Sequence, residues 1–221
     1  MEKKGIYRIH SSCISNGKEC ILIIGPKNSG KSTFALSLLT NQYKMVSDDQ
    51  TFIIRKKNQF NIIPFYQLMK IKQKNIELIP TFLISSISLK KDLFNYLAPE
   101  LQVASRLKSS FGDISTIVDL GKSGFKVEKK SLPLKAIVLM KLTGKIKSKI
   151  KLIDSTDCYK KIIPFFFEKD LYKKDYLIDE RMSKIREDFC TNMCAKIPMY
   201  GLKFGVDYPK IGLKVKKIMK F

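Results

Sequence analysis

The sequence predicts an α/β fold in which helices pack against a mixed sheet. One observation is a short β-rich apolar run, Cys20 to Ile24, followed by a glycine loop and then by a segment of helix formers. A second is the almost wholly apolar run Ala136 to Leu142, which is typical of a central strand. A third is the return from helical patterns to strand character at Ile197 to Phe204. With 44% hydrophobic residues and no long linker rich in Gly, Ser or Pro, residues 1–221 are expected to form a single domain.

The first half of the chain is expected to contain two hairpins around this loop. Tyr7 to Ile14 carries β-branched and aromatic residues, and Asn16-Gly17 is a strong signal for a tight turn into the next strand. The other elements expected in this half are a helix from about Lys31 to Leu39, a strand over Tyr43 to Val46 that runs into Ser47-Asp48-Asp49, and a second hairpin that joins Thr51 to Ile54 with Phe60 to Ile63.

The second half is expected to alternate helices with the two later strands. Leu89 to Lys108 fits a helical pattern that Pro99 interrupts, because proline favours the first turn of a new helix. Ser109 to Gly124 contains several glycines, which indicates an exposed and mobile segment. Asp154-Ser155 can cap a helix that continues to about Lys161, and Glu168 to Cys194 has a mostly helical pattern.

Residues 25 to 33 read Gly-Pro-Lys-Asn-Ser-Gly-Lys-Ser-Thr, a complete G-x-x-x-x-G-K-[ST] phosphate loop between the expected strand and helix. Glycines allow successive backbone N–H groups to converge on phosphate oxygens, and the start of a helix adds the positive end of its dipole. An ordinary glycine turn before a lysine is the alternative. The candidate nucleotide-binding residues are Gly25, Asn28, Ser29, Gly30, Lys31, Ser32 and Thr33.

Two polar landmarks flank this loop along the chain. His10 precedes it by one hairpin, and Asp48-Asp49 ends the strand that follows the loop helix. Since sequential strands usually lie side by side, these residues are expected to meet the loop at one edge of the sheet. The alternatives are a satisfied histidine on a half-buried strand, and an acidic pair that forms either a metal site for simple ATP hydrolysis or a turn.

The formal charge of +22 would suit nucleic acid or another acidic partner, but it comes almost entirely from lysine. The five arginines are scattered along the chain, so the charge is interpreted mainly as compositional background, and a nucleic-acid partner is not expected. Lys145, Lys147, Lys149 and Lys151 alternate with other residues, as on one solvated face of a strand.

The five cysteines show no paired spacing, so they are expected to be reduced thiols. The amino end does not resemble a signal peptide, and no window approaches the roughly 18 apolar residues that cross a bilayer. A cytoplasmic protein with no membrane partner is therefore expected.

The coupled landmarks from His10 to Asp49 resemble those of the HPr kinase/phosphorylase catalytic domain and its compact, single-domain relatives. The resemblance is carried by Ile9-His10-Ser11-Ser12, by Cys20 through the loop to Thr33, and by Met45-Val46-Ser47-Asp48-Asp49. It implies a P-loop-containing mixed sheet of the type shared with phosphoenolpyruvate carboxykinase. It also implies ATP and Mg²⁺ as cofactors.

By this resemblance, Lys31 holds the transferring phosphate, Ser32 ligates Mg²⁺ and Asp49 accepts the proton of an attacking serine. Asp48 would contact the metal or His10, and His10 would lie beside the catalytic carboxylate. The catalytic candidates are therefore His10, Lys31, Asp48 and Asp49, and the metal candidates are Ser32 and Asp48.

The implied activity is that of an ATP-dependent serine kinase acting on a peptide or small protein. Compact relatives often accompany ribosomally made peptides such as lasso peptides. The rival hypotheses are a kinase of the same core that acts on a small-molecule hydroxyl, and a P-loop ATPase or nucleic-acid-binding protein. Ser11 replaces a common family glycine, Thr33 replaces an acid, and no counterpart of the family's Glu-Ile-Arg-Gly-Leu-Gly-type segment is located, so whether the chain has phosphorylase activity is left open. A homo-oligomer and the choice between ATP and GTP are left open.

Overall fold

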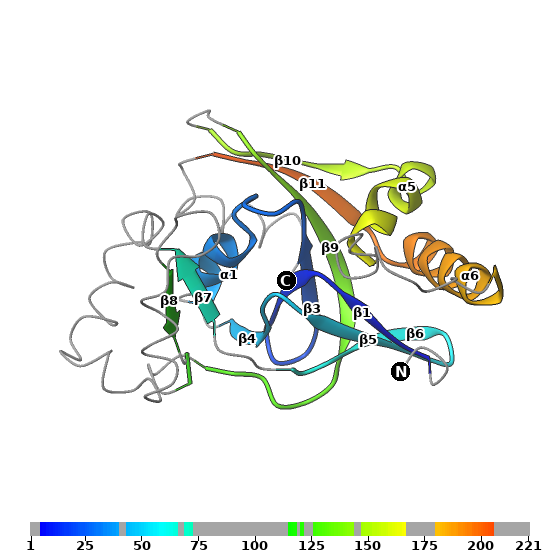
Figure 1. The fold of residues 1–221 in the computed structure, drawn as a ribbon, viewed down its shortest axis with the longest axis horizontal. Coiled ribbons are helices and arrows are strands. Elements are labelled where there is room, and N and C mark those ends of the chain that lie inside the picture. The colour runs from blue at the N-terminus through cyan, green and yellow to red at the C-terminus, as the bar shows by residue number, and fades with distance from the viewer. Residues whose placement is uncertain are drawn as a thin grey trace.

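The computed structural model describes residues 5–39, 43–65, 69–72, 115–118, 120–121, 126–143, 147–166 and 180–205. In chain order the elements are β1 (Ile6–Ile9), β2 (Ser11–Ser15), β3 (Cys20–Ile24), α1 (Lys31–Leu39), β4 (Lys44–Ser47), β5 (Thr51–Lys56), β6 (Gln59–Ile63), β7 (Met69–Lys72), β8 (Ser115–Val118), β9 (Leu132–Leu142), β10 (Lys149–Ile153), α5 (Ser155–Phe166), α6 (Glu180–Lys196) and β11 (Met199–Phe204). The fold is a mixed α/β arrangement around a curled sheet (Figure 1).

Strand β9 lies at the centre of this sheet, which has nine strands in the described part of the chain. It pairs in parallel with β3 along one edge and with β11 along the other. Its first residues, Leu132 and Pro133, pair instead with β6 in an antiparallel ladder. The sheet therefore continues from β9 through β6 to β5 and β1, through β11 to β10, and through β3 to β2 and β4.

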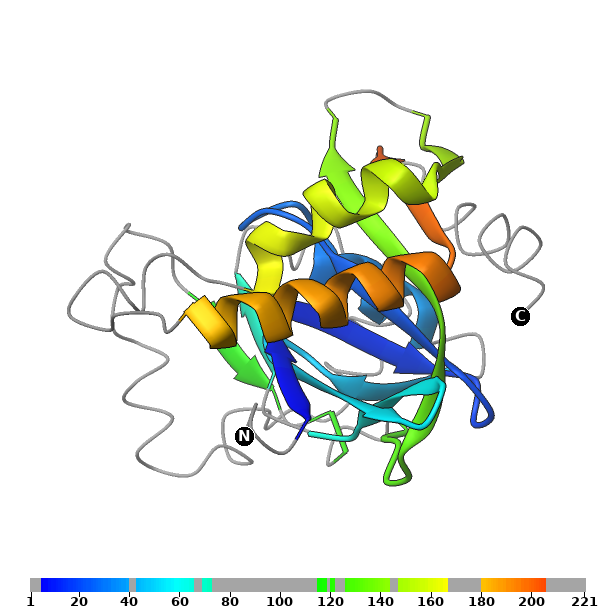
Figure 2. The same ribbon diagram turned by 90° about the vertical axis from the view of Figure 1, so that its right-hand side faces the viewer.

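Both faces of the sheet are covered at β3. Successive residues of a strand point to opposite sides, so Ile21 and Ile23 of β3 pack with Phe34 of α1. Leu22 and Ile24 belong to the apolar cluster on the other side, which includes residues of α5 and α6. Figure 2 shows these two helices lying across that second face. Strand β3 is buried along its whole length for this reason, as its apolar sequence predicts.

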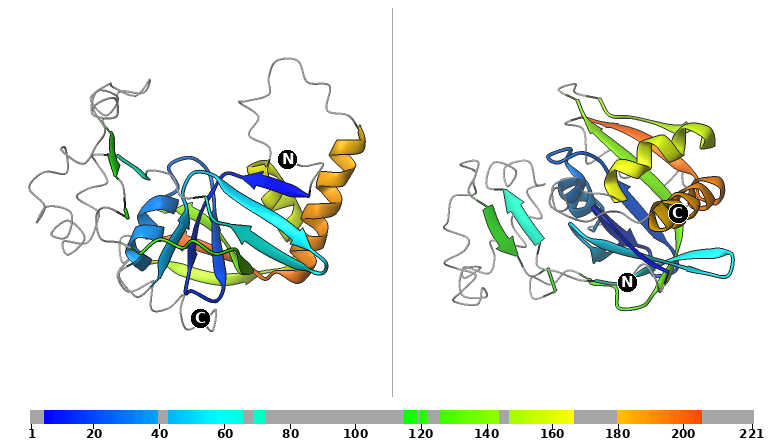
Figure 3. Two further views of the ribbon diagram at one scale, coloured as in Figure 1. Left: turned by 90° about the horizontal axis from the view of Figure 1, so that it is seen from below. Right: turned by 45° about the vertical axis from the view of Figure 1, so that its right-hand side comes forward.

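Helix α1 is itself covered on the side away from the sheet. Met69 of β7 and Leu120 belong to the same buried cluster as Phe34 and Leu38. In Figures 1 and 3, β7 and β8 lie beyond α1 as seen from β3. Because α1 is enclosed from both sides, the loop that leads into it is held by a buried strand and a buried helix.

Most of the expected elements are confirmed. Helix α1 has the expected bounds, β2 and β3 form the first hairpin across Asn16 and Gly17, and β5 and β6 form the second. Strand β9 is central, but it begins at Leu132 because its first residues pair with β6. Helix α5 continues to Phe166, well past Lys161, and α6 confirms the helical pattern expected in its region.

Two sequence-based expectations about strands were wrong. Tyr7 to Ile14 is not one strand, because the ladder breaks at His10, where β1 pairs with β5 while β2 pairs with β3 and β4. The segment Ser109 to Gly124 is not wholly exposed: β8 pairs with β7, and Leu120 is fully buried. Leu89 to Lys108, residues 109–114 and residues 168–179 lie outside the described residues.

Glu128 joins the segment before β9 to β4. Its carboxylate accepts hydrogen bonds from the Ser15 hydroxyl (3.0 Å) and from the backbone N–H groups of Lys129 and Lys130 (3.0 and 3.1 Å), and Lys44 Nζ lies 3.3 Å away. Burial alone would raise the pKa of Glu128, but these donors lower it below its usual value. The ionised carboxylate therefore stabilises this junction at neutral pH.

The cysteines and the surface lysines follow the sequence-based expectations. All five cysteines are buried and free, and Cys158 Sγ lies 2.6 Å from Cys194 Sγ between α5 and α6. Lys147, Lys149 and Lys151 are exposed beside β10, as a solvated face requires, whereas Lys145 lies outside the described residues. Over the described parts of the chain, no helix combines the length and apolar character needed to cross a membrane.

Candidate active site

The glycine loop connects β3 to α1 through a sharply folded backbone. Asn28 and Gly30 both adopt left-handed angles, with φ of 66° and 87°. The Ser29 N–H donates to the Pro26 carbonyl (3.1 Å), which closes the turn. A Cβ on Gly25 would lie 2.6 Å from Ser29 Oγ and 2.7 Å from the Met140 carbonyl oxygen, so only glycine fits where the loop leaves β3.

The side chains of this loop suit an anionic ligand. Ser29 Oγ is buried, and in the described structure it has no hydrogen-bond partner, which is unfavourable unless a ligand supplies one. The Lys31 ammonium donates to the carbonyls of Gly25 (3.0 Å) and Pro26 (3.1 Å), so a cation is held within the loop. The N–H groups of a helix's first turn have no acceptor within the helix, and α1 directs its first turn at this loop.

Asp48 faces the start of α1. Its carboxylate is only 6% exposed and accepts hydrogen bonds from Ser12 Oγ and from Ser32 Oγ, which lies 3.0 and 3.1 Å from its two oxygens. Burial raises the pKa of Asp48 to about 6, the hydroxyls of Ser12 and Ser32 oppose this rise, and the nearby charge of Asp49 adds to it. The Ser32 hydroxyl and the Asp48 carboxylate are oxygen ligands of the kind that Mg²⁺ prefers.

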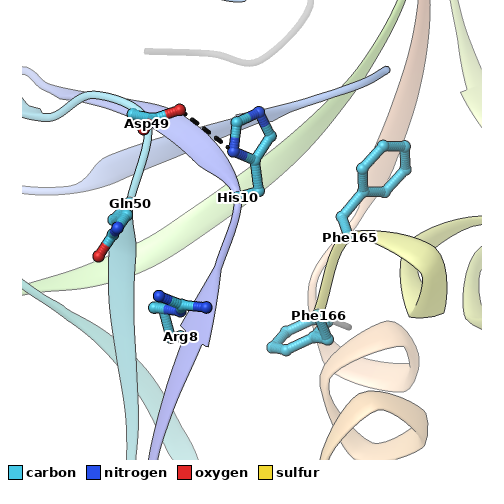
Figure 4. A pocket seen from close by; sticks show the side chains of 6 residues that line it. All are labelled: Arg8, His10, Asp49, Gln50, Phe165 and Phe166. Carbon is cyan, nitrogen blue, oxygen red and sulfur yellow. Dashed lines mark ion pairs between the residues drawn. The ribbon is translucent and has the colours of Figure 1, made fainter. Parts of the chain in front are cut away.

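Asp49 faces away from Asp48 and pairs with His10. Its backbone has a left-handed φ of 66°, and the Gln50 N–H donates to the Asp48 carbonyl (2.8 Å) in the same tight turn. The turn places Asp49 Oδ1 3.2 Å from His10 Nδ1, as Figure 4 shows. Asp49 is 68% exposed, so its carboxylate is accessible to a substrate.

The sheet register explains why His10 and the acidic pair meet. Ile9 pairs with Thr51 between β1 and β5, and Cys13 pairs with Ser47 between β2 and β4. Residues 10–12 and 48–50 therefore lie opposite each other. At this point each of the two segments passes from one part of the sheet to the other. The two hairpins thus bring together residues that are distant in sequence.

Buried hydroxyl groups hold this crossing together. Ser11 Oγ donates to Thr51 Oγ1 (2.7 Å), and Ser47 Oγ lies 2.6 Å from the same oxygen. The Ser11 hydroxyl is accommodated by Thr51. The His10 N–H donates to the carbonyl of Phe165 (3.0 Å), which links the crossing to the end of α5.

A small, partly open cavity lies beside the His10–Asp49 pair. It is lined by Arg8, His10, Asp49, Gln50, Phe165 and Phe166. Figure 4 shows the two phenylalanines, from the end of α5, across the cavity from the strand residues. The carboxylate pair thus has two sides: Asp48 faces the glycine loop, and Asp49 faces this cavity.

The structure brings the residues singled out in the sequence into two contacting groups. Ser32 with Asp48 forms one, and His10 with Asp49 forms the other, so Asp49 rather than Asp48 is the partner of His10. Gly25, Asn28, Ser29, Gly30, Lys31 and Thr33 lie in the loop or in the first turn of α1.

Sequence reasoning missed Ser12 and the cavity residues from α5. Ser12 follows His10 by two residues and lies in the same stretch of resemblance, so its position could have drawn attention to it. The run Pro164-Phe165-Phe166 was a visible aromatic cluster, but nothing in the sequence shows that α5 ends beside His10.

The fold and the site define an α/β protein in which a glycine loop, a buried carboxylate and a histidine–carboxylate pair lie close together. No protein-family model matches the chain, and no curated protein matches its sequence. Among solved structures, the chain is similar to the HPr(Ser) kinase/phosphatase from Coxiella burnetii, with 14% sequence identity and a TM-score of 0.40. That match covers 96% of this chain and 93% of that chain.

Proposed function

We propose that this chain is an ATP-dependent serine kinase that phosphorylates a peptide or a small protein. The observation that carries the proposal is the turn at Asp48 and Asp49, which contacts Ser32 at the start of α1 on one side and His10 on the other. A nucleotide held by the glycine loop and an acceptor held beside His10 would then meet at this turn. The resemblance of residues 9–49 to HPr kinase-like proteins supports the same activity.

In the proposed reaction, Asp49 takes the proton from the serine hydroxyl. The serine oxygen forms a bond to the γ-phosphorus, the bond from that phosphorus to the β,γ-bridging oxygen breaks, and ADP leaves. His10 Nδ1, 3.2 Å from Asp49 Oδ1, orients the carboxylate for this transfer. Most of the rate would come from alignment and charge neutralisation rather than from the base.

The glycine loop and Asp48 would hold the triphosphate. Lys31 would exchange its bonds with the Gly25 and Pro26 carbonyls for bonds to phosphate oxygens, and Ser29 Oγ would gain the partner it lacks in the described structure. Ser32 and Asp48 would ligate Mg²⁺, which supplies positive charge between the phosphates. Asp48 must be ionised for this role, and it is ionised above its pKa of about 6.

The exposure of Asp49 favours a peptide or small-protein acceptor. Asp49 is accessible from solvent, so a chain segment can reach it without a lid closing over a small molecule. A ribosomally made precursor peptide, such as that of a lasso peptide, is a candidate acceptor suggested by the resemblance.

The test is incubation of the purified chain with Mg²⁺ and γ-labelled ATP. Three acceptor panels are used: serine-containing peptides, small molecules with hydroxyl groups such as sugars and free serine, and DNA and RNA. Mass spectrometry locates the phosphate on the acceptor. The control is the Asp49→Asn variant, which lacks the carboxylate proposed to take the serine proton. We expect phosphoserine in peptides and a large loss with the variant.

The other results identify the rival functions. Phosphate on a small-molecule hydroxyl alone would indicate a metabolite kinase. Release of inorganic phosphate that nucleic acid stimulates, with no phosphorylated acceptor, would indicate an ATPase. Either result would contradict the proposal.

A further inference from the structure

The cavity beside His10 lies on the opposite side of the acidic turn from the glycine loop. Asp48 is bonded to Ser12 and Ser32, whereas Asp49 lines the cavity together with His10. The residues that line the cavity come from β1, from the turn and from the end of α5, and none of them belongs to the glycine loop. The cavity therefore adjoins the candidate nucleotide site without being part of it.

One lining residue carries a positive charge and contacts no carboxylate in the described structure. Arg8 is half-buried, and in the described part of the chain its guanidinium has no acidic partner. The Asp49 carboxylate lines the same cavity, but it contacts His10 Nδ1 (3.2 Å) rather than the Arg8 guanidinium. A partly buried cation without a counter-ion is unfavourable, so an anion that entered the cavity would be bound favourably.

We infer that this cavity binds the phosphoacceptor, and that Arg8 holds a carboxylate of the acceptor close to its serine hydroxyl. This inference rests on the proposed function, because it identifies Asp49 as the group that receives the hydroxyl proton. The carboxylate belongs either to the chain terminus of the acceptor or to an acidic side chain next to the serine. Both sources offer the planar pair of oxygens that a guanidinium binds through two parallel hydrogen bonds.

The spacing along β1 fits this arrangement. Arg8 precedes His10 by two residues, which corresponds to roughly 7 Å along an extended chain. A serine hydroxyl placed at Asp49, beside His10, leaves the adjoining part of the acceptor within reach of Arg8.

The size and lining of the cavity limit what it can hold. The cavity is small and partly open to solvent, so an acceptor would contact it with the serine side chain and the adjoining carboxylate rather than enter it whole. Phe165 and Phe166 form the wall across from the strand residues, but the surface exposed in the cavity is mostly polar, which suits a charged group. Phe166 also packs edge-on against Phe189 of α6, so this wall is held in place.

Three short peptides test the inference, each with phenylalanine before serine. The first is acetyl-phenylalanyl-serine with a free terminal carboxylate, the second is its neutral amide, and the third adds aspartate after the serine and ends in an amide. Their binding is measured by calorimetry in the presence of Mg²⁺ and ADP, and their phosphorylation is measured with Mg²⁺ and ATP. The first and third peptides separate a chain terminus from an acidic side chain as the source of the carboxylate.

Arg8→Gln removes the charge at the cavity, and Arg55→Gln is the matched control. Arg55 is an exposed arginine on β5, so its replacement changes the net charge equally without touching the cavity. Arg8→Lys keeps the charge but loses the two-pronged guanidinium. For the parent protein we expect at least one carboxylate peptide to bind about 10- to 100-fold more tightly than the neutral amide. Arg8→Gln should remove that preference, Arg8→Lys should reduce it, and Arg55→Gln should leave it intact.

Equal binding of the neutral and carboxylate peptides to the parent protein would overturn the inference without any variant, so a folding defect in Arg8→Gln cannot hide the answer. A preference that survives Arg8→Gln, or that Arg55→Gln abolishes equally, would also overturn it. The proposed function fails separately: if Arg8-dependent peptide binding is observed but no peptide receives phosphate, Arg8 binds a peptide carboxylate in this cavity, but the peptide is not a phosphoacceptor and the kinase assignment is wrong.

Discussion

Asp48 is expected to destabilise the fold at neutral pH. The change that tests this is Asp48→Asn, which removes the charge and keeps the shape. The new side-chain oxygen can accept the same hydrogen bonds from Ser12 and Ser32, and the Ser32 hydroxyl can accept one from the new amide. Replacement therefore removes the cost of a buried charge without opening a cavity.

The size of the effect follows from the pKa of Asp48. A rise from 3.8 to about 6 corresponds to about 3 kcal/mol at 1.36 kcal/mol for each pKa unit. Because the pKa is higher in the folded state, the folded protein binds more protons than the unfolded chain between these two values. The free energy of unfolding therefore falls as pH rises from about 4 to above 6, and the cost is fully present at pH 7.5. Relaxation around the charge reduces the observable gain to roughly 1–3 kcal/mol.

Urea unfolding of the parent and of Asp48→Asn, at several pH values between 4 and 8, measures this cost. We expect the variant to be more stable by roughly 1–3 kcal/mol at pH 7.5, with a melting temperature about 2–10 °C higher. The difference should shrink toward zero as pH falls to about 4. Asp49→Asn is the matched control: its carboxylate is exposed, so its stability should change by less than about 0.5 kcal/mol. A variant that is equally stable or less stable at pH 7.5, or a difference that does not depend on pH, would refute the reasoning.

Four further outcomes are expected. Asp49→Asn should lower kcat for peptide phosphorylation by about 10²- to 10⁴-fold with little change in the affinity for Mg·ADP; a variant of normal activity would exclude Asp49 as the base. Ser12→Ala removes a hydrogen bond that lowers the pKa of Asp48, so the acid limb of the pH–activity profile should move to higher pH, and an unmoved limb would contradict this. Gly25→Ala should weaken ADP binding in titration calorimetry, because the new Cβ would collide with a backbone carbonyl, and unchanged affinity would show that the loop adapts. Glu128→Gln should cost about 1–3 kcal/mol of unfolding free energy at pH 7, and the loss should diminish in acid, where the parent carboxylate is also protonated; a loss that does not vary with pH would contradict the assigned role of the charge.

Local sequence signals were sufficient for the elements around the glycine loop. A continuous apolar run marked β3, Asn16-Gly17 marked the first hairpin, and the loop motif marked the start of α1. These signals act over a few residues, so they can be read without knowing the rest of the fold.

The break at His10 could not be read in this way. Tyr7 to Ile14 has a continuous strand pattern. Before His10 this segment pairs with β5, and after His10 it pairs with β4, because β5 and β4 lie in different parts of the sheet. The opposite orientations of Asp48 and Asp49 depend on the left-handed turn at Asp49, for which aspartate is permitted but not required. The cavity depends on where α5 ends, which is set by packing between residues distant in sequence.

Binding of Mn²⁺ together with ADP, measured by electron paramagnetic resonance, tests the central claim most directly. Manganese substitutes for magnesium and reports whether the metal sits on both the nucleotide phosphates and the protein. We expect one Mn·ADP to bind per chain, with an affinity at least about tenfold lower in Asp48→Asn and nearly unchanged in Asp49→Asn. Mn·ADP binding that is unaffected by Asp48→Asn, or the absence of nucleotide binding by the parent protein, would contradict the account.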